Sequence, residues 1–151
     1  MKHLFSVLLI SLAAGTVSKA ASANECALTI EANDMMQFST KALSAPSSCK
    51  EVSLTLKHTG KLPATTMGHN WVLSKAADVQ AVATDGMTAG ASNSYVKPGD
   101  DRVYAVSKVI GGGEQTTVTF STERLKKGED YRFFCSFPGH FAIMQGSFSL
   151  I

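Results

Sequence analysis

Short segments in which apolar and polar residues alternate, separated by turn-forming residues, constrain the fold of this chain more than any other feature. Val52, Leu54 and Leu56 share one face of such a segment, as expected of a half-buried β-strand. Turn signals at 97–100 (Lys-Pro-Gly-Asp) and at the glycines 111–113 separate the segments. Many short strands joined by turns predict an all-β fold, a β-sandwich or barrel. The predicted strands are 26–30, 52–56, 70–73, 103–106, 116–120, 131–135 and 146–151.

Residues 76–89 do not follow the strand pattern. Alanines together with Val79, Val82 and Met87 recur there at a spacing that fits a short helix better than a strand. We therefore expect a short helical insertion flanking the sheets. The sequence has no internal repeat and no linker, which favours a single domain.

The first residues have the features of a secretory signal peptide. A basic start precedes an apolar run at 4–14, which is too short to span a bilayer. The small residues 21–23 (Ala-Ser-Ala) then form a signal-peptidase cleavage pattern. We expect residues 1–23 to be removed and residues 24–151 to form one domain in the periplasm. No second apolar stretch approaches membrane length, so no membrane span is predicted.

The charge balance argues against nucleic acid or an anionic membrane surface as a partner. The chain carries 14 basic and 12 acidic residues. Lys2 and Lys19 would leave with the signal peptide, and the remaining domain would then have equal numbers of each. A neutral domain has no electrostatic attraction to polyanions. We expect any partner to meet it through apolar contact.

Three cysteines in an exported protein suggest one disulfide and one remaining thiol. Cys26 and Cys49 are the natural pair, because both lie early and closing their loop would contribute about 3 kcal/mol in the entropy model. Cys135 then stands alone. A free thiol in an oxidising compartment needs an explanation, and metal ligation is favoured over a buried inert thiol or an intermolecular bond.

A cysteine, a histidine and a methionine lie close together near the C-terminus, at Cys135, His140 and Met144. A strand leading into a Pro-Gly turn would form a hairpin loop that points these side chains at one spot. His69, far upstream, supplies a further ligand candidate. Two histidines, one cysteine and a weak axial methionine form the ligand set of an electron-transfer copper site. Because protein atoms would fill every position, this set argues against catalysis.

Four segments resemble the azurins, a family of blue copper proteins, and the resemblance extends over essentially all of residues 24–151. Four residues separate Cys135 from His140 and three separate His140 from Met144. This loop spacing is similar to that of azurins, whereas plastocyanins and pseudoazurins have a shorter first gap. The matching segments are 33–38 (NDMMQF), 67–73 (MGHNWVL), 84–87 (TDGM) and 133–140 (FFCSFPGH).

The resemblance implies a two-sheet Greek-key sandwich of the cupredoxin kind with a helical flap. It implies a single-electron carrier with one copper ion that cycles between Cu(II) and Cu(I), and no enzymatic activity. It also implies the disulfide between Cys26 and Cys49 and a distant fifth metal contact from the Gly68 carbonyl. Asn70 and Phe137 match positions beside the ligands, where Asn70 would brace the ligand loop through hydrogen bonds.

Azurins resemble one another in an apolar surface around the outer histidine, which matches His140 here. Such a patch would suit brief docking of a monomer with redox proteins such as c-type cytochromes or copper reductases. One matching position near the patch that is often aliphatic is Thr66 in this chain, which makes the surface slightly more polar. The patch residues are Met36, Leu62, Met67, Met87, Phe137, Pro138, Gly139 and Ala142.

Other residues with ligand chemistry have simpler interpretations. His58 follows an alternating strand and is predicted to be a packed or hydrogen-bonded structural histidine. Trp71 is the only tryptophan and is predicted to lie in the core. Met35 and the methionines of the patch have no ligand-like spacing, so none of them is predicted to form another copper site.

Three rival functions compete with electron transfer. A copper oxidase or nitrite reductase needs a second metal, but only His58 would remain to build it once His69 and His140 bind the first. A copper buffer or chaperone would use exposed, mobile ligands rather than a short constrained loop. A structural zinc site fits imidazole and thiolate, although a thioether is a poor zinc ligand.

Overall fold

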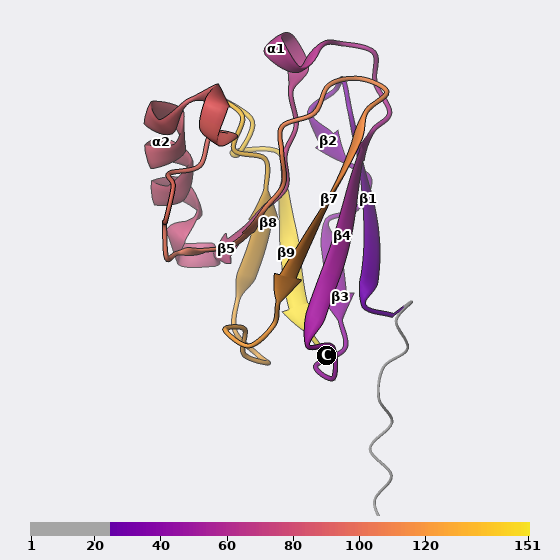
Figure 1. Ribbon diagram of the computed structural model, residues 1–151, viewed down its shortest axis with the longest axis vertical. Coiled ribbons are helices and arrows are strands. Elements are labelled where there is room, and N and C mark those ends of the chain that lie inside the picture. The colour runs from indigo at the N-terminus through magenta and orange to yellow at the C-terminus, as the bar shows by residue number, and fades with distance from the viewer. Residues whose placement is uncertain (1–24) are drawn as a thin grey trace, which may run out of the picture.

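Two β-sheets pack face to face in the computed structural model, which describes residues 25–151 (Figure 1). The predicted signal peptide at 1–23 lies outside the described residues. One sheet has the strand order β2-β1-β4-β7 and the other the order β3-β9-β8-β5-β6. The strands are β1 (Ala27–Asn33), β2 (Gln37–Phe38), β3 (Ala42–Ala45), β4 (Glu51–His58), β5 (Val72–Lys75), β6 (Val103–Val106), β7 (Gln115–Ser121), β8 (Tyr131–Phe134) and β9 (Gln145–Leu150).

Both sheets are mixed. Strand β1 runs parallel to β4, with Ile30 opposite Leu56, and β3 runs parallel to β9. The other strand pairs are antiparallel. The predicted two-sheet sandwich is confirmed.

Alternation along the strands builds the core between the sheets. In β4, Val52, Leu54 and Leu56 are fully buried, while the residues between them face outward. Trp71 is also fully buried and stacks between two rings of the opposite walls, at 5.8 Å from Phe120 and 6.0 Å from Phe133 between ring centroids. Its predicted place in the core is therefore correct.

The helical insertion covers one side of the second sheet, as Figure 1 shows. It consists of the 3₁₀ turn η1 (Ala76–Asp78), the helix α2 (Val79–Ala89) and the 3₁₀ turn η2 (Ala91–Asn93). The buried side chains of α2 pack against Val72 and Phe134 of the sheet. We call residues 76–96 the flap. The predicted helix at 76–89 is thus correct in place, although its first turn is 3₁₀.

Strands β2 and β3, the helix α1 and the 3₁₀ turn η2 were not predicted, and β5 begins two residues later than expected. The strand expected at 70–73 starts at Val72, because the backbone of Trp71 bonds to Ser107 instead of to a neighbouring strand. Strand β2 has only two residues, and β3 (Ala-Leu-Ser-Ala) has one large apolar side chain, so neither shows alternation; they exist through their pairing with β1 and β9. The helix α1 (Ala64–Met67) is a single turn.

The predicted disulfide joins Cys26 and Cys49 at the start of the first sheet. It ties the residue before β1 to the loop that leads into β4, so it holds the ends of two paired strands together. Within residues 25–151, no helix is both long enough and apolar enough to cross a membrane.

Candidate metal centre

Two loops at one end of the sandwich carry the predicted ligands (Figure 1). His69 lies between α1 and β5, where its backbone exchanges two hydrogen bonds with Ile110, of 3.0 and 2.9 Å. Cys135 follows the last residue of β8, and Met144 precedes the first residue of β9. The segment that they bound, residues 135–144, is the ligand loop.

Hydrogen bonds within the ligand loop fix its shape. The amide of Met144 donates to the His140 carbonyl at 2.8 Å, and the amide of Cys135 donates to the Met144 carbonyl at 3.0 Å. Gly139 has a φ of 82°, a left-handed conformation that glycine adopts without strain. The loop therefore brings its first and last residues together while it places His140 between them.

Three ligand atoms converge in this loop region. The Sγ atom of Cys135 lies 3.8 Å from Nδ1 of His69 and 3.6 Å from Nδ1 of His140. A set of ligand atoms from these three residues lies within 4.8 Å of one another, and all three residues are buried. Met144 is fully buried as well. The fold thus brings His69 next to the ligand loop, although the two are far apart in the sequence.

The hydrogen bonding of His69 prepares it to bind a metal. Its Nε2 atom lies 2.8 Å from the Asn33 carbonyl oxygen, which can only accept, so Nε2 carries the proton. The Nδ1 atom is then left with a free lone pair, and this is the atom that faces Cys135. Fixing the second ring nitrogen in this way is how proteins orient metal-binding histidines.

Burial keeps the ligand groups uncharged. Desolvation lowers the pKa of His69 to about 4 and also lowers the pKa of His140. Desolvation raises the pKa of the Cys135 thiol to about 12. Neutral imidazoles are the form that binds metals, whereas a thiolate in such a dry site needs a cation beside it. The donor set therefore fits a copper ion with soft and borderline ligands.

Gly68 and Phe137 lie beside the ligand cluster. The Gly68 carbonyl oxygen is 3.9 Å from Sγ of Cys135. A Cβ atom at Gly68 would lie 2.4 Å from the carbonyl oxygen of Ala64, so only glycine fits there. The ring of Phe137 lies 4.7 Å from that of His140.

Asn70 joins the two ligand-bearing segments. Its Oδ1 atom accepts a hydrogen bond of 2.8 Å from the backbone amide of Ser136, and its Nδ2 atom donates to Ser136 Oγ at 2.8 Å. Asn70 and Ser136 are both buried. Sequence reasoning missed Ser136, and its place directly after Cys135 was the only available signal.

His58 is close to the site without forming part of the ligand cluster. Its ring stacks on that of His69 at 4.5 Å between centroids. Its Nε2 atom bonds to the Met67 carbonyl at 2.9 Å, and its Nδ1 atom accepts a hydrogen bond of 3.0 Å from Gly60. Both ring nitrogens are in use, as the prediction of a structural histidine requires.

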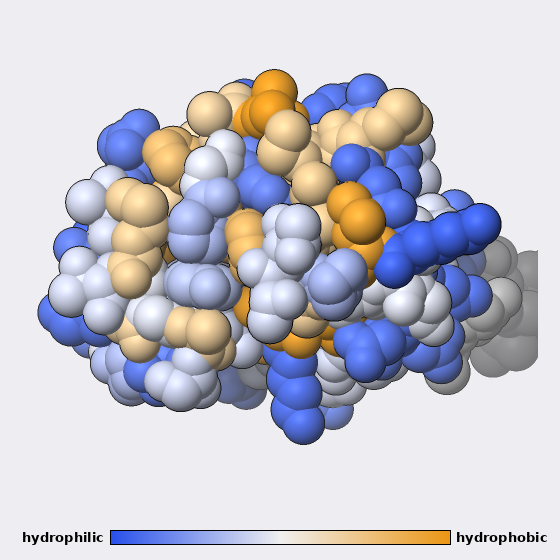
Figure 2. Space-filling model, turned by 90° about the horizontal axis from the view of Figure 1, so that it is seen from above, coloured by the Kyte–Doolittle hydropathy of each residue, from blue (hydrophilic) through white to orange (hydrophobic). Residues whose placement is uncertain are grey.

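The predicted patch residues are partly or largely exposed, and Figure 2 shows apolar residues interspersed with neutral ones on the end of the molecule that the ligand loops form, with the most hydrophilic residues mostly toward its edge. Leu62 and Met87 are 39% and 46% exposed, whereas His140 is only 4% exposed. His140 is therefore almost fully covered, although its neighbours Pro138 and Gly139 are exposed.

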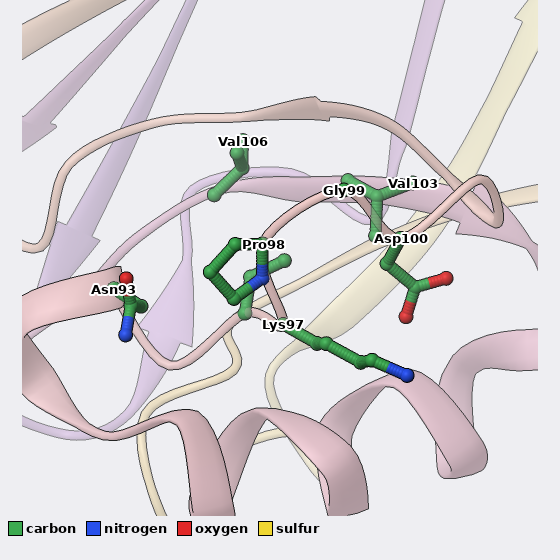
Figure 3. A pocket seen from close by; sticks show the side chains of 8 residues that line it. Asn93, Lys97, Pro98, Gly99, Asp100, Val103 and Val106 are labelled. Carbon is green, nitrogen blue, oxygen red and sulfur yellow. The ribbon is translucent and has the colours of Figure 1, made fainter.

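A surface hollow beside the flap is separate from this cluster (Figure 3). Valines from β6 and from the loop after η2 line it, together with Pro98, Lys97 and Asp100. None of these residues is a predicted metal ligand.

Comparisons with known proteins agree with this geometry. The family model for copper binding proteins, plastocyanin/azurin family, matches residues 24–150. An azurin from Alcaligenes faecalis is 59% identical over 125 residues, which are 83% of this chain and 98% of the relative. An azurin from Pseudomonas aeruginosa is 49% identical over 150 residues, which are 99% of each chain. The solved structure of the azurin Az-iso2 from Methylomonas sp. strain J superposes with a TM-score of 0.81 at 49% identity, covering 83% of this chain and 98% of that one.

Proposed function

This chain belongs to the plastocyanin/azurin family of copper-binding proteins and is an electron carrier with a type 1 copper site, and we propose that it passes single electrons between redox proteins in the periplasm. The observation that carries this proposal is the convergence of His69, Cys135 and His140, with ligand atoms within 4.8 Å of one another in a buried site. Met144, fully buried beside them, would supply a thioether ligand. When bound, copper supplies a one-electron couple between Cu(II) and Cu(I).

The residues around the site are suited to electron transfer because they keep the ligands in place. The Asn33 carbonyl holds the ring of His69. Asn70, the residue after His69, bonds to the Ser136 amide and so ties the His69 segment to the ligand loop. Ligands that the protein itself holds in position have little need to move when the charge of the site changes. The Gly68 carbonyl, at 3.9 Å from Sγ of Cys135, would act as a distant fifth contact.

The protein is a non-enzymatic electron carrier. His69, Cys135 and His140 form the cluster, Met144 completes the ligand set, and the outer ligand His140 is 4% exposed. A substrate would need an open coordination position to react at the metal. Electrons need only a short path to the surface, which His140 provides.

We place the docking surface for redox partners around His140, at the apolar patch defined above. Met87 and Leu62 project from it with 46% and 39% of their surface exposed. Small apolar contacts bind weakly and release quickly, as a carrier that meets two partners requires. Partners of the kind proposed are c-type cytochromes or copper reductases, which a monomer of this protein would meet in the periplasm after removal of residues 1–23.

A visible spectrum and a redox titration of the copper-loaded protein test this function. An intense visible band that bleaches reversibly with one electron supports it. Loss of metal on reduction would indicate a copper buffer instead, and a protein purified with zinc that does not take up copper would indicate a structural zinc site. Electron exchange with a c-type cytochrome, followed by stopped-flow absorption, tests the proposed class of partner.

A further inference from the structure

Two consecutive residues of the flap, Ser94 and Tyr95, follow η2 and contact the ligand loop, in addition to the packing of Phe141 against the flap. Their φ angles are 53° and 52°. Left-handed backbone at two successive residues other than glycine is strained, and such strain persists only where the surroundings hold it. Asn93, labelled at the end of η2 in Figure 3, immediately precedes the pair.

The strained conformation presents the Ser94 carbonyl to the metal-site network. This oxygen accepts a hydrogen bond of 2.7 Å from Nδ2 of Asn70 and one of 3.2 Å from Oγ of Ser136. Asn70 in turn accepts from the Ser136 amide at 2.8 Å. One carbonyl of the flap therefore bonds to both segments that carry ligands, next to His69 on one side and next to Cys135 on the other.

Tyr95 makes a second contact with the ligand loop. Its ring lies edge-on against Phe137, with 5.2 Å between centroids, and Phe137 lies 4.7 Å from His140. Gly86 of α2 fits closely behind it, because a Cβ atom there would lie 2.0 Å from the Tyr95 carbonyl oxygen. The helix thus sets the position of the pair from behind.

We propose that the Ser94 carbonyl is a positioning group for the copper site, through which helix α2 sets the orientation of Asn70 and Ser136 and so the geometry at Cys135. This inference rests on the proposed function for its redox consequence. Its structural basis, the hydrogen bonds of Ser94 with Asn70 and Ser136, does not depend on bound metal. The flap would therefore tune the site without contributing a ligand.

Two substitutions at one position separate backbone geometry from side-chain chemistry. Ser94→Asn keeps a residue that tolerates the left-handed region, whereas Ser94→Val introduces a β-branched residue that does not. Gly86→Ala pushes on the Tyr95 backbone from the helix. Gly128→Ala is the control for backbone strain elsewhere, because Gly128, like Ser94 and Tyr95, has a positive φ, of 82°, but a Cβ atom there meets nothing within 4 Å.

The first readout is the redox equilibrium of the copper-loaded protein. We expect Ser94→Val and Gly86→Ala to change the ratio of reduced to oxidised protein by about threefold at fixed potential, or about 28 mV, since tenfold corresponds to about 59 mV for one electron. Ser94→Asn and Gly128→Ala should stay close to the unmodified protein. Unchanged potentials for both Ser94→Val and Gly86→Ala, or an equal shift in Gly128→Ala, would overturn the proposal.

The second readout uses metal-free protein. We expect Ser94→Val to speed hydrogen exchange of the Ser136 amide by about tenfold relative to the amide of Phe133 in β8, because Asn70 loses its fixed orientation. Gly128→Ala should leave this ratio unchanged. If Ser94→Val does not fold, Gly86→Ala decides by the same two measurements. A protein without a reversible copper couple would refute the proposed function, while the exchange experiment would still decide the inference.

Discussion

The Sγ atom of Cys135 lies 3.6 Å from Nδ1 of His140, and both side chains are buried. The segment between them contains a turn in which the His140 amide donates a hydrogen bond to the Phe137 carbonyl. This arrangement aims sulfur and imidazole at the same point, where His69 arrives from another loop. A change at any of these three residues therefore acts on one shared centre.

Replacing Cys135 with serine should abolish the intense visible absorption, because the thiolate is the ligand that gives a type 1 site its strong charge-transfer band. The measurement is the visible spectrum of the copper-loaded variant. The remaining cysteines are joined in a disulfide, so thiol titration of the unfolded chain should find one thiol in the unmodified protein and none in the variant. Persistence of the blue colour would refute the role of Cys135.

Replacing Met144 with leucine should leave copper bound and shift the reduction potential, because the thioether is a weak axial ligand. The potential is measured by redox titration, and the copper content by atomic absorption. Met35→Leu is the control, since this methionine is 69% exposed and outside the ligand set. Wholesale loss of copper from Met144→Leu would count against an axial role.

Asp100 should make the fold sensitive to acid. The Arg102 guanidinium donates to this nearly buried carboxylate at 2.8 and 2.6 Å and lowers the pKa of Asp100. Because the folded-state pKa is below the unfolded value of about 3.9, the stabilisation is complete above that value and is lost as the pH falls through the lowered pKa.

The substitution Asp100→Asn should therefore lower the free energy of unfolding by about 1–2 kcal/mol at pH 7, with the difference shrinking as the pH falls below about 4. Urea unfolding at both pH values measures it. Asp101→Asn, one residue away and exposed, should have little effect. A deficit of Asp100→Asn that is equally large in acid would contradict the assignment.

The fluorescence of Trp71 should be strongly blue-shifted in the folded protein. Within residues 25–151, its Nε1 atom is the one buried side-chain nitrogen or oxygen without a hydrogen-bond partner. The excited indole then forms no hydrogen bond with water, and no water can reorient around it to lower its energy, so its emission stays at short wavelength. Emission spectra of metal-free protein test this, and unfolding should move the maximum to that of exposed indole. Ready quenching of the folded protein by iodide would show that the core site is open.

Met87→Lys should slow electron self-exchange, because it places a charge on the proposed docking patch of both colliding copies. We expect a decrease of about tenfold at low salt, shrinking as the ionic strength rises. NMR line broadening of mixed oxidised and reduced protein measures the rate. Ala81→Lys, on the same helix but outside the patch, is the control. Equal rates for the two variants would place the contact elsewhere.

Much of the fold and of the ligand set follows from local patterns. The alternation of Val52, Leu54 and Leu56 identifies β4, because burial of one face leaves a period of two in the chain. The ligand loop is equally local, since Cys135, His140 and Met144 lie on a single hairpin whose spacing limits the chemistry that it can perform. Strand β2 has two residues and β3 has one large apolar side chain, so neither shows such a pattern.

Contacts between distant segments were decided by tertiary structure alone. The Asn33 carbonyl fixes the proton of His69 on Nε2, and the Ser94 carbonyl reaches Asn70 and Ser136 only because the flap packs against the second sheet. Backbone carbonyls are the same in every residue, so their use as acceptors leaves no mark on the sequence. Side-chain types and their spacing therefore predict which residues bind the metal, while the packing of the loops determines which groups hold those residues in position.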